Sequence, residues 1–300
     1  MLLIQVVRYA LRKFFSREVS FCQNKTPTNS DQILSVRVSG PKVTIVIPTR
    51  DRVDLLRNCI ESVREHTLYE NYEILVVDNG SEESQTLVYL RELQQNGIQS
   101  LDFPGEFNFA AICNFATQRA SGQVLCFLNN DALIFQPEWL DWLVSKSLEV
   151  DVGVVGPVLL ETEDLISEAG IGLGHRGIAG TIFRGRRFSD PFISEALTWD
   201  HPVSAISFAC AVVTKEKYLN LGGMDEGFAV GLNDVDFGMK ASSLSLTNFL
   251  VSSSRVRHSG YGSRRRMSDL SGGFKATKEI LSFLRKYPRF RFEDEFICPN

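Results

Sequence analysis

Two amides and a carboxylate, Asn129, Asn130 and Asp131, directly follow the apolar run at 124–128. An apolar run of this length that ends in polar residues is typical of a strand buried on both faces of a parallel sheet. Open α/β sheets bind ligands at the carboxyl ends of such strands, and side-chain oxygens held there suit a hard cation such as Mg²⁺ or Mn²⁺. Asn and Asp also favour turns for local reasons, so this stretch alone leaves a metal site and a simple turn open.

Two earlier apolar runs also end in polar residues. The β-branched run at 43–47 stops at Pro48 and is followed by Thr49, Arg50 and Asp51. The run at 72–77 ends at Asp78, which precedes Asn-Gly-Ser. Because the carboxyl ends of parallel strands meet at one edge of a sheet, we expect all three polar loops to converge there.

Helical patterns separate these predicted strands. Val53, Leu56, Ile60 and Val63 share one face of a predicted helix, and residues 87–93 fit a second helix that stops at Asn96-Gly97. Strand, helix, strand, helix, strand is the order of a parallel sheet with right-handed crossovers. The sequence therefore predicts an α/β fold with a Rossmann-like, mostly parallel sheet flanked by helices.

The first loop argues against two common nucleotide sites. A dinucleotide-binding oxidoreductase needs G-x-G-x-x-G after its first strand, where this chain has Pro48-Thr49-Arg50, and no G-x-x-x-x-G-K-[ST] phosphate loop occurs. A nucleotide bound at this edge would have no glycine cradle for its phosphates. A metal ion is then the obvious way to neutralise a diphosphate.

Composition describes an ordinary globular protein. The 300 residues suffice for one large domain or two small ones, with 44% hydrophobic and 23% charged residues. A formal net charge of −4 gives no case for nucleic-acid binding. No apolar window approaches 18 residues, so no membrane-spanning helix is predicted. The six cysteines form no C-x-x-C pair, and we expect buried thiols in a reducing compartment.

The two ends of the chain differ from its middle. Residues 1–20 carry four basic side chains against one acidic, with apolar residues at nearly helical spacing. We expect an amphipathic helix there, which either lies on anionic lipid or packs on the domain or on a partner. A polar linker completes residues 1–40, and the folded domain begins near Pro41. Residues 266–300 are predicted to form a C-terminal helical tail.

Seven motifs in order give the chain a family resemblance over about 43–263. It resembles a family 2 inverting glycosyltransferase with the GT-A fold, with a domain at 41–265 that divides into a nucleotide-binding half (41–135) and a smaller acceptor and catalytic half (136–265). The 107–114 motif resembles rhamnosyltransferase-like members that act on bacterial surface polysaccharides. The motifs are Val-Ile-Pro-Thr-Arg-Asp-Arg (46–52), Ile-Leu-Val-Val-Asp-Asn-Gly-Ser (74–81), Phe-Asn-Phe-Ala-Ala-Ile-Cys-Asn (107–114), Phe-Leu-Asn-Asn-Asp (127–131), Gly-Gly-Met-Asp-Glu-Gly-Phe (222–228), Asn-Asp-Val-Asp-Phe (233–237) and His258.

The resemblance implies a site for a nucleotide-diphosphate sugar, with a UDP- or dTDP-sugar as donor. Asp78 would accept a hydrogen bond from the nucleobase, although Asp is also a common cap of turns and helices. Asp131 and His258 would bind Mg²⁺ or Mn²⁺ on the diphosphate. The other residues that the resemblance assigns to the donor pocket are Pro48, Thr49, Arg50, Asp51, Asn108, Asn114, Asn129 and Asn130.

The resemblance also implies one catalytic base. Asp234 would take the proton from the acceptor hydroxyl, and Asp236 cannot face the same way because residues i and i+2 of a helix point to different sides. Asn129 and Asn233 stand where the family often has acids. Gly238 replaces a residue that normally packs, so we expect a weaker helix there. Asp225 and Glu226 contact the acceptor or shape its loop; both interpretations remain open.

The predicted function is metal-assisted, inverting transfer of a sugar to a glycan or lipid-linked acceptor, in surface polysaccharide synthesis. We expect a cytoplasmic location, with peripheral contact at the inner face of the membrane through residues 1–20. The alternative is a GT-A-fold binding or scaffold protein with impaired catalysis, which Asn129 and Asn233 would favour. A nucleotidyltransferase is less consistent, because the chain lacks an early glycine-rich, basic phosphate loop.

Overall fold

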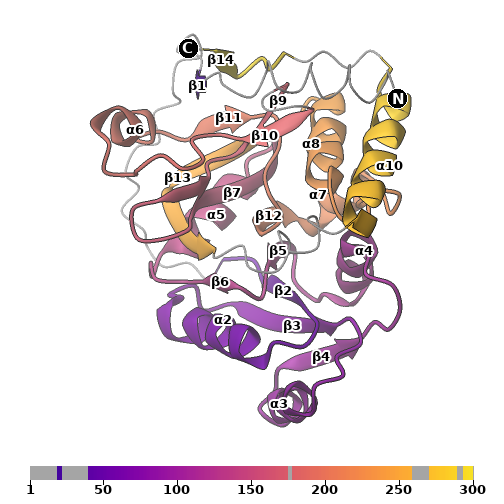
Figure 1. The fold of residues 1–300 in the computed structure, drawn as a ribbon. Helices are drawn as coiled ribbons and strands as arrows, with labels where there is room; N and C mark the ends of the chain where they lie inside the picture. The colour runs from indigo at the N-terminus through magenta and orange to yellow at the C-terminus, as the bar shows by residue number, and fades with distance from the viewer. Residues whose placement is uncertain (1–18, 22–39, 175–177, 259–269, 289–292, 300) are drawn as a thin grey trace.

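One large sheet organises the chain (Figure 1). The computed structural model describes residues 19–21, 40–174, 178–258, 270–288 and 293–299. The strands of the sheet are hydrogen-bonded in the order β11-β13-β7-β12-β5-β2-β3-β4. In chain order they are β2 (Val43–Thr49), β3 (Tyr72–Asp78), β4 (Gln99–Asp102), β5 (Val124–Leu128), β7 (Val152–Leu160), β11 (His201–Val203), β12 (Cys210–Thr214) and β13 (Thr247–His258).

Most neighbouring strands run in the same direction. β4, β3, β2 and β5 form a parallel block, and β7 pairs with β13 in parallel. β12 is antiparallel to both β5 and β7, so it joins two blocks that point the same way, and β11 is antiparallel at the edge. The prediction of a mostly parallel α/β sheet is confirmed. Short strands β6 (Ala132–Leu133) and β8 (Ile166–Glu168) pair with β13 and β7.

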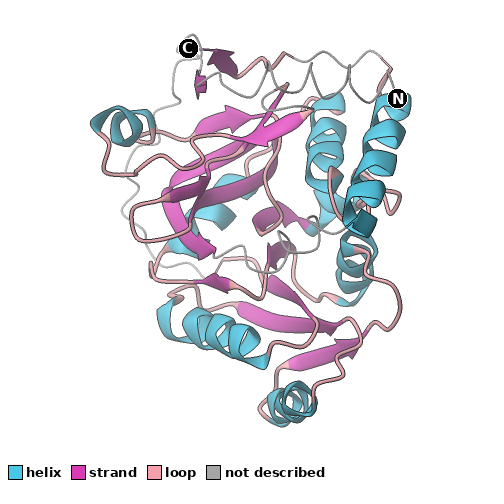
Figure 2. Ribbon diagram, in the orientation of Figure 1, coloured by secondary structure: helices cyan, strands magenta, loops and turns pink. Residues whose placement is uncertain are grey.

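Helices cover both faces of the sheet (Figure 2). One buried cluster packs α2 (Val53–His66), α3 (Ser84–Gln95) and α5 (Trp139–Ser147) on one face, and a second packs α4 (Phe109–Arg119), α7 (Lys215–Asn220) and α8 (Asn233–Ser243) on the other. Strand β5 alternates between the two clusters, with Cys126 in one and Leu125 and Phe127 in the other. Burial on both faces explains why its sequence is an unbroken apolar run.

The C-terminal helix α10 (Leu270–Lys286) lies beside α8 (Figure 1). Phe283 of α10 is fully buried in a third cluster with Phe228 and with Val235 of α8. The segment predicted as a tail therefore packs on the helix that carries the proposed base. The remaining elements are α6 (Pro191–Ala196), the strand pair β9 (Ile171–Leu173) and β10 (Ala179–Thr181), and the pair β1 (Val19–Phe21) and β14 (Ile297–Pro299).

The helix predicted at residues 1–20 lies outside the described residues, apart from its last positions in β1. No helix in the described part of the chain has the length and apolar content needed to cross a membrane.

Gly238 has a role in α8 that the sequence did not show. A Cβ at this position would lie 2.5 Å from the carbonyl oxygen of Ser204 and 2.7 Å from the Cβ of Ala205. The helix thus approaches the chain at 204–205 closely enough to exclude any side chain. The expectation that Gly238 merely weakens the helix was incomplete, because its missing Cβ is what allows α8 to pack here.

We therefore expect Gly238→Ala to destabilise the fold. The gain in helix propensity is up to about 1 kcal/mol, whereas forcing a methyl group against a backbone carbonyl typically costs about 1–3 kcal/mol and shifts the backbone. The free energy of unfolding, measured in urea, should fall for Gly238→Ala and change little for Ser242→Ala, an exposed position on the same helix. An alanine variant at least as stable as wild type would contradict the close approach.

Candidate active site

The loops after β2, β3 and β5 meet at one edge of the sheet, as the sequence predicted. Thr49 and Asp78 are direct register partners at the ends of β2 and β3. The Thr49 hydroxyl accepts a 3.0 Å hydrogen bond from the Nδ2 of Asn130. The backbone carbonyl of Thr49 accepts a 2.8 Å hydrogen bond from the backbone N–H of Asn79. These bonds connect the three loops directly.

Hydrogen bonds join the loop at Asp51 to the loop at Asp78. The Ser81 hydroxyl donates a 2.5 Å bond to Asp78 Oδ1 and accepts a 2.7 Å bond from the backbone N–H of Asp51. Asp51 Oδ1 in turn accepts from the backbone amides of Glu82 and Glu83, at 2.7 and 2.8 Å. Asp51 has a left-handed backbone, with φ 54°. The Asp51 carboxylate thus holds the two loops together, the Asp78 carboxylate caps its own turn, and nucleobase binding by Asp78 stays a prediction.

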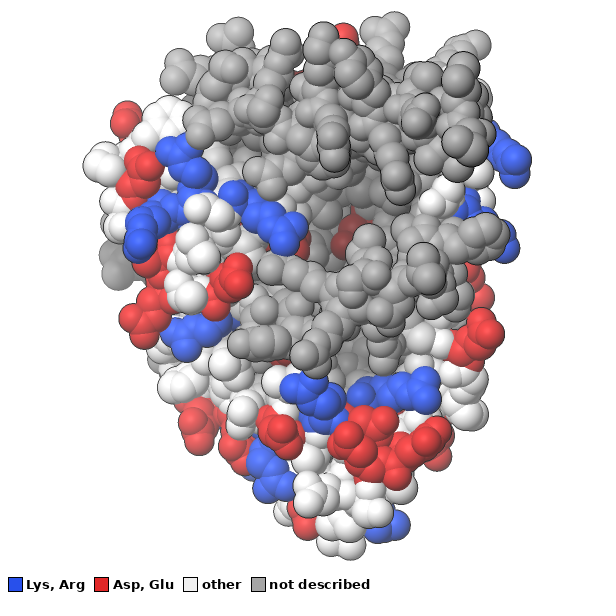
Figure 3. Space-filling view, in the orientation of Figure 1, with Lys and Arg blue, Asp and Glu red and all other residues white. Residues whose placement is uncertain are grey.

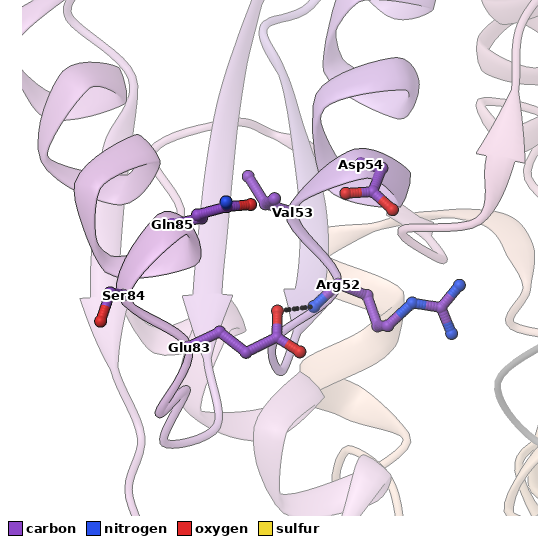
Figure 4. A pocket seen from close by; sticks show the side chains of 6 residues that line it. All are labelled: Arg52, Val53, Asp54, Glu83, Ser84 and Gln85. Carbon is purple, nitrogen blue, oxygen red and sulfur yellow. Dashed lines mark hydrogen bonds between the residues drawn. The ribbon is translucent and has the colours of Figure 1, made fainter.

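A surface hollow of about 460 Å³ lies between the first turns of α2 and α3 (Figure 4). Glu83 projects into it, and its Oε2 accepts a 3.1 Å bond from the Arg52 amide. Two carboxylates in the lining make the hollow unsuited to a diphosphate, because like charges repel. The lining residues are Arg52, Val53, Asp54, Glu83, Ser84 and Gln85.

The two predicted metal ligands lie in contact. Asp131 Oδ1 is 3.2 Å from Nε2 of His258, and both side chains are almost completely buried. The same nitrogen is 3.3 Å from Nδ2 of Asn129. Strand β13 ends at His258, which pairs with Ala132 of β6, so the antiparallel pairing of β6 and β13 brings the histidine to the β5 loop.

This donor set fits one divalent ion. A carboxylate oxygen and an imidazole lone pair that face each other need a proton or a cation between them, and 3.2 Å is compatible with two ligands of one ion. Within the described residues, no group of three or more His, Cys, Asp or Glu side chains forms a complete metal cage. The pair therefore suits an ion that takes its other ligands from a bound diphosphate, as Mg²⁺ commonly does.

Asn108 and Asn114 hold the turn at 222–228. Asn108 caps α4 by accepting a 3.1 Å bond from the Ala111 amide, and its Nδ2 donates to the carbonyl of Glu226 at 2.9 Å. Asn114 accepts from the Tyr218 hydroxyl and the Met224 amide and donates to two oxygens of the turn. Those four bonds use the whole capacity of its amide. The contacts thus show a structural role, and donor binding by these residues stays a prediction.

Asp234 lies in the first turn of α8. The pKa of its carboxyl is raised from 3.8 to about 7: desolvation is the largest cause, the negative charge of Glu168 adds to it, and a hydrogen bond from the Phe208 amide opposes both. The rings of Phe208 and Phe237 pack together, with centroids 5.3 Å apart. The residue is half-buried, and a carboxyl with a pKa near neutrality is suited to general base catalysis.

A short segment connects the base to the predicted metal loop. The Phe208 amide hydrogen-bonds to Asp234, and the carbonyl of the next residue, Ala209, accepts a 2.9 Å bond from the Asn129 amide. The face of the molecule is hollowed near the centre of Figure 3, with acidic side chains visible inside. The structure therefore brings together Asp131, His258 and Asn129, and attaches Asp234 to the same edge through residues 208–209.

Glu168 is a site residue that sequence reasoning missed. It ends β8, opposite Leu159 of β7, and no local motif marks it. Its negative charge acts on the pKa of Asp234 because the fold brings two residues together that are far apart in the sequence.

Two solved structures have the same fold. A mannosyltransferase from Pyrobaculum calidifontis, in complex with GDP-Man and Mn²⁺, superposes with a TM-score of 0.59 over 95% of this chain and 71% of its own, at 14% identity. GalNAc-T7 with UDP, GalNAc and Mn²⁺ also gives a TM-score of 0.59, over 73% of this chain and 43% of its own, at 18% identity. The sheet and its polar edge are thus those of a GT-A glycosyltransferase fold.

Residues 44–220 match glycosyl transferase family 2, and the chain belongs to that family. The O-antigen biosynthesis protein RfbC of Myxococcus xanthus is 34% identical over 260 residues, which are 85% of this chain and 20% of RfbC. The O-antigen chain rhamnosyltransferase RfbN of Salmonella typhimurium is 27% identical over 104 residues, 34% of this chain and 32% of RfbN. The chain therefore spans about a fifth of RfbC and a third of RfbN.

Because the pKa of Asp234 is raised in the folded chain, the contribution of this residue to the free energy of unfolding should fall as the pH rises from about 4 to about 7. The folded chain keeps this proton up to about pH 7, whereas the unfolded chain releases it near pH 4. Folding therefore takes up a proton between these values, and the contribution of Asp234 to stability is greatest below pH 4 and is lost as the pH rises through 7.

The free energy of unfolding of Asp234→Asn should equal that of wild type near pH 4 and exceed it by on the order of 1–3 kcal/mol at pH 8. Urea titrations at both pH values measure the difference, with Glu216→Gln as an exposed-carboxylate control. Equal pH dependence of wild type and Asp234→Asn would show that the carboxyl is not buried as described.

Proposed function

We propose that the chain transfers a sugar, with inversion, from a nucleotide-diphosphate donor to a hydroxyl of a glycan or lipid-linked acceptor. The observation that carries this proposal is the arrangement at the sheet edge. Asp131 on the loop after β5 and His258 at the end of β13 form a buried carboxylate–imidazole pair, and residues 208–209 connect that loop to a carboxyl with a pKa near 7. Inverting transfer needs one base and one means of stabilising the leaving diphosphate.

Asp234 is the proposed base. A base is most effective when its pKa lies near the working pH, because it is then ionised in a useful fraction of molecules and still accepts a proton readily. Burial and Glu168 supply that pKa. Once ionised, the Asp234 carboxylate takes the proton of the acceptor hydroxyl. The hydroxyl oxygen attacks the anomeric carbon of the donor sugar, and the nucleoside diphosphate leaves on the opposite side of that carbon.

Asp131 and His258 would hold Mg²⁺ or Mn²⁺, which neutralises the charge that develops on the leaving diphosphate. Of the predicted donor contacts, Thr49 and Asn130 already hydrogen-bond to each other at this edge. We assign Pro48, Thr49, Arg50, Asp51 and Asp78 to the nucleoside, and Asn129 and Asn130 to the donor sugar or ribose. Both similar structures contain Mn²⁺ together with a nucleotide or nucleotide sugar, which supports a metal ion and a nucleotide-sugar donor for this chain.

The biological setting is proposed from the relatives. RfbC and RfbN are named for O-antigen synthesis, and RfbN for rhamnosyl transfer. We therefore propose transfer of a hexosyl or deoxyhexosyl group during surface polysaccharide synthesis, by a cytoplasmic protein in peripheral contact with the membrane that carries a lipid-linked acceptor. The name of RfbN favours rhamnose as the sugar, carried by a UDP- or dTDP-sugar donor.

The alternative, a binding or scaffold protein, rests on Asn129 and Asn233. In the structure, the side-chain oxygen of Asn233 (Oδ1) accepts a 2.8 Å hydrogen bond from the backbone N–H of Asp234, so the Asn233 side chain shapes the first turn of α8. A scaffold would bind the nucleotide without turnover, and the two experiments below separate the two functions.

Donor binding should depend on the metal. In calorimetric titrations, we expect UDP or dTDP to bind in the presence of Mn²⁺ and to bind at least 10-fold more weakly without it, because the ion would join the Asp131 carboxylate to the negatively charged diphosphate. Asp131→Ala should abolish this dependence on Mn²⁺, and Glu216→Gln should retain it. If neither nucleotide binds with Mn²⁺, the transferase proposal fails for these donors.

The transfer reaction should follow the ionisation of Asp234. With the donor found by calorimetry, we expect kcat/KM for nucleoside diphosphate release to rise with pH through about 7, and Asp234→Asn to bind donor normally but lose at least 100-fold in turnover. Glu168→Gln removes a neighbouring negative charge, so its activity should begin to rise at a lower pH. Turnover by Asp234→Asn at the wild-type rate would refute the base assignment.

A further inference from the structure

The segment at 225–236, which ends in the first turn of α8, is held by the C-terminal helix at several points. We call it the base segment, because it leads to and includes Asp234. Three polar side chains of the C-terminal region contact it, and they belong to Glu279, Lys286 and Tyr287. None of these residues belongs to a family motif, and the chemistry proposed above does not use them.

Glu279 binds the base segment just before α8. Its Oε1 accepts a 3.0 Å bond from the Val230 amide, and its Oε2 accepts a 2.9 Å bond from the Gly231 amide. The residue is only 7% exposed. Burying a carboxylate is costly unless hydrogen bonds satisfy it, and here two backbone amides do so. Glu279 thus fixes the backbone immediately upstream of the base.

Lys286 and Tyr287 bind the base segment on the other side of Asp234. The Tyr287 hydroxyl donates a 2.8 Å bond to Oδ1 of Asp236, and the Lys286 ammonium lies 2.6 Å from the same oxygen. Lys286 also lies 2.6 Å from Asp225 at the start of the segment. Asp236 is fully buried, and Lys240 of α8 lies 3.4 Å from its other carboxylate oxygen. Two ammonium groups and one hydroxyl therefore compensate this buried charge, and two of these three partners come from the C-terminal region.

An apolar contact completes the attachment. Phe283 is fully buried, and its ring lies 6.1 Å from that of Phe228 in the base segment and 4.8 Å from that of Tyr287, measured between centroids. The buried face of α10 is therefore directed at the base segment. Leu281 lies on the opposite face and is 50% exposed.

The backbone of the base segment needs this support. Leu232, which immediately precedes α8, has φ 60° in the left-handed region, a conformation that costs about 1–2 kcal/mol for a residue with a side chain. Such a conformation persists only where the surroundings determine it. Helix α4 supplies contacts from the other side, since the Phe109 amide donates to the carbonyl of Ala229 at 2.9 Å. The base segment is thus held between α4 and α10.

We propose that α10 and the residue that follows it are a positioning element for catalysis, in which Glu279, Lys286 and Tyr287 hold the base segment and so fix the place of Asp234 at the start of α8. This inference rests on the proposed function, in which Asp234 is the base. The three are positioning residues, because the contacts described for them end on the backbone at 230–231 and on Asp225 and Asp236, and none ends on Asp234.

The first test measures Asp234 without any substrate. Carbon-13 NMR of the full chain, with labelled aspartate carboxyls and Asp234 assigned from Asp234→Asn, follows its titration in Glu279→Gln and Tyr287→Phe. The other groups that act on this titration are Glu168 on β8 and the Phe208 amide, and both are unchanged in these variants. The Cys113 thiol of α4 also faces Asp234, but burial raises its pKa well above 9 and it stays neutral in this pH range. Loss of an α10 contact should admit water and lower the pKa of Asp234 by about one unit or more.

Leu281→Ala, on the exposed face of α10, is the matched control and should titrate as wild type. Tyr287→Phe removes only one hydroxyl, so it keeps the test decisive if Glu279→Gln does not fold. An unshifted Asp234 titration in a folded Tyr287→Phe and in any folded Glu279→Gln would overturn the proposal, because a merely stabilising helix would lower the unfolding midpoint and leave this pKa unchanged.

The second test measures catalysis. Glu279→Gln should lower kcat for nucleoside diphosphate release about 10-fold with donor affinity unchanged, and in the Asp234→Asn background the same substitution should cost nothing more. An equal loss in both backgrounds would overturn positioning through Asp234. The two proposals fail separately. Normal turnover by Asp234→Asn would refute the assignment of Asp234 as the base. A shifted NMR titration of Asp234 in the α10 variants would still show that α10 controls the surroundings of Asp234.

Discussion

The burial of strand β5 is the constraint on which the rest of the structure depends. β5 is fully buried, it pairs with β2 in parallel on one side and with β12 antiparallel on the other, and its side chains enter the clusters on both faces of the sheet. A strand held on all sides cannot shift its register without exposing apolar side chains or losing backbone hydrogen bonds. The position of the loop at 129–131 is therefore rigid, and every element of the site is arranged around that loop.

Two contacts between distant parts of the chain bring the candidate catalytic and metal-binding residues to the loop after β5. The pairing of β13 with β6 brings His258 to Asp131, and residues 208–209 attach the first turn of α8 to the same loop. The two regions differ in solvation and charge. The Asp131–His258 pair offers a buried carboxylate and imidazole to a cation, whereas Asp234 lies close to Glu168 and apolar rings, which hold its proton until about neutral pH. Metal binding and proton transfer are thus assigned to separate carboxylates by their surroundings.

The asparagines and the C-terminal helix have a common structural effect. Asn108 and Asn114 bind the turn at 222–228 from α4, while Glu279, Lys286 and Tyr287 bind the segment that follows it from α10. The left-handed Leu232 lies between these attachments. Residues from distant parts of the chain therefore determine where α8 begins, and through it where the proposed base lies.

The sequence by itself determined the parallel sheet and the polar ends of β2, β3 and β5, because apolar periodicity and strand-end chemistry are local and leave a readable pattern. The candidates His258 and Asp234, and the metal role of Asp131, came from the family resemblance of its motifs. The sequence did not indicate Glu168, the α10 contacts, or the turn that Asn108 and Asn114 bind. From the sequence, Gly238 was expected to weaken its helix. In the structure, the carbonyl oxygen of Ser204 lies 2.5 Å from where a Cβ at position 238 would be. Only the tertiary structure decided these points, because the pKa of a buried carboxyl and the partner of a buried side chain depend on groups that are near in space and distant along the chain.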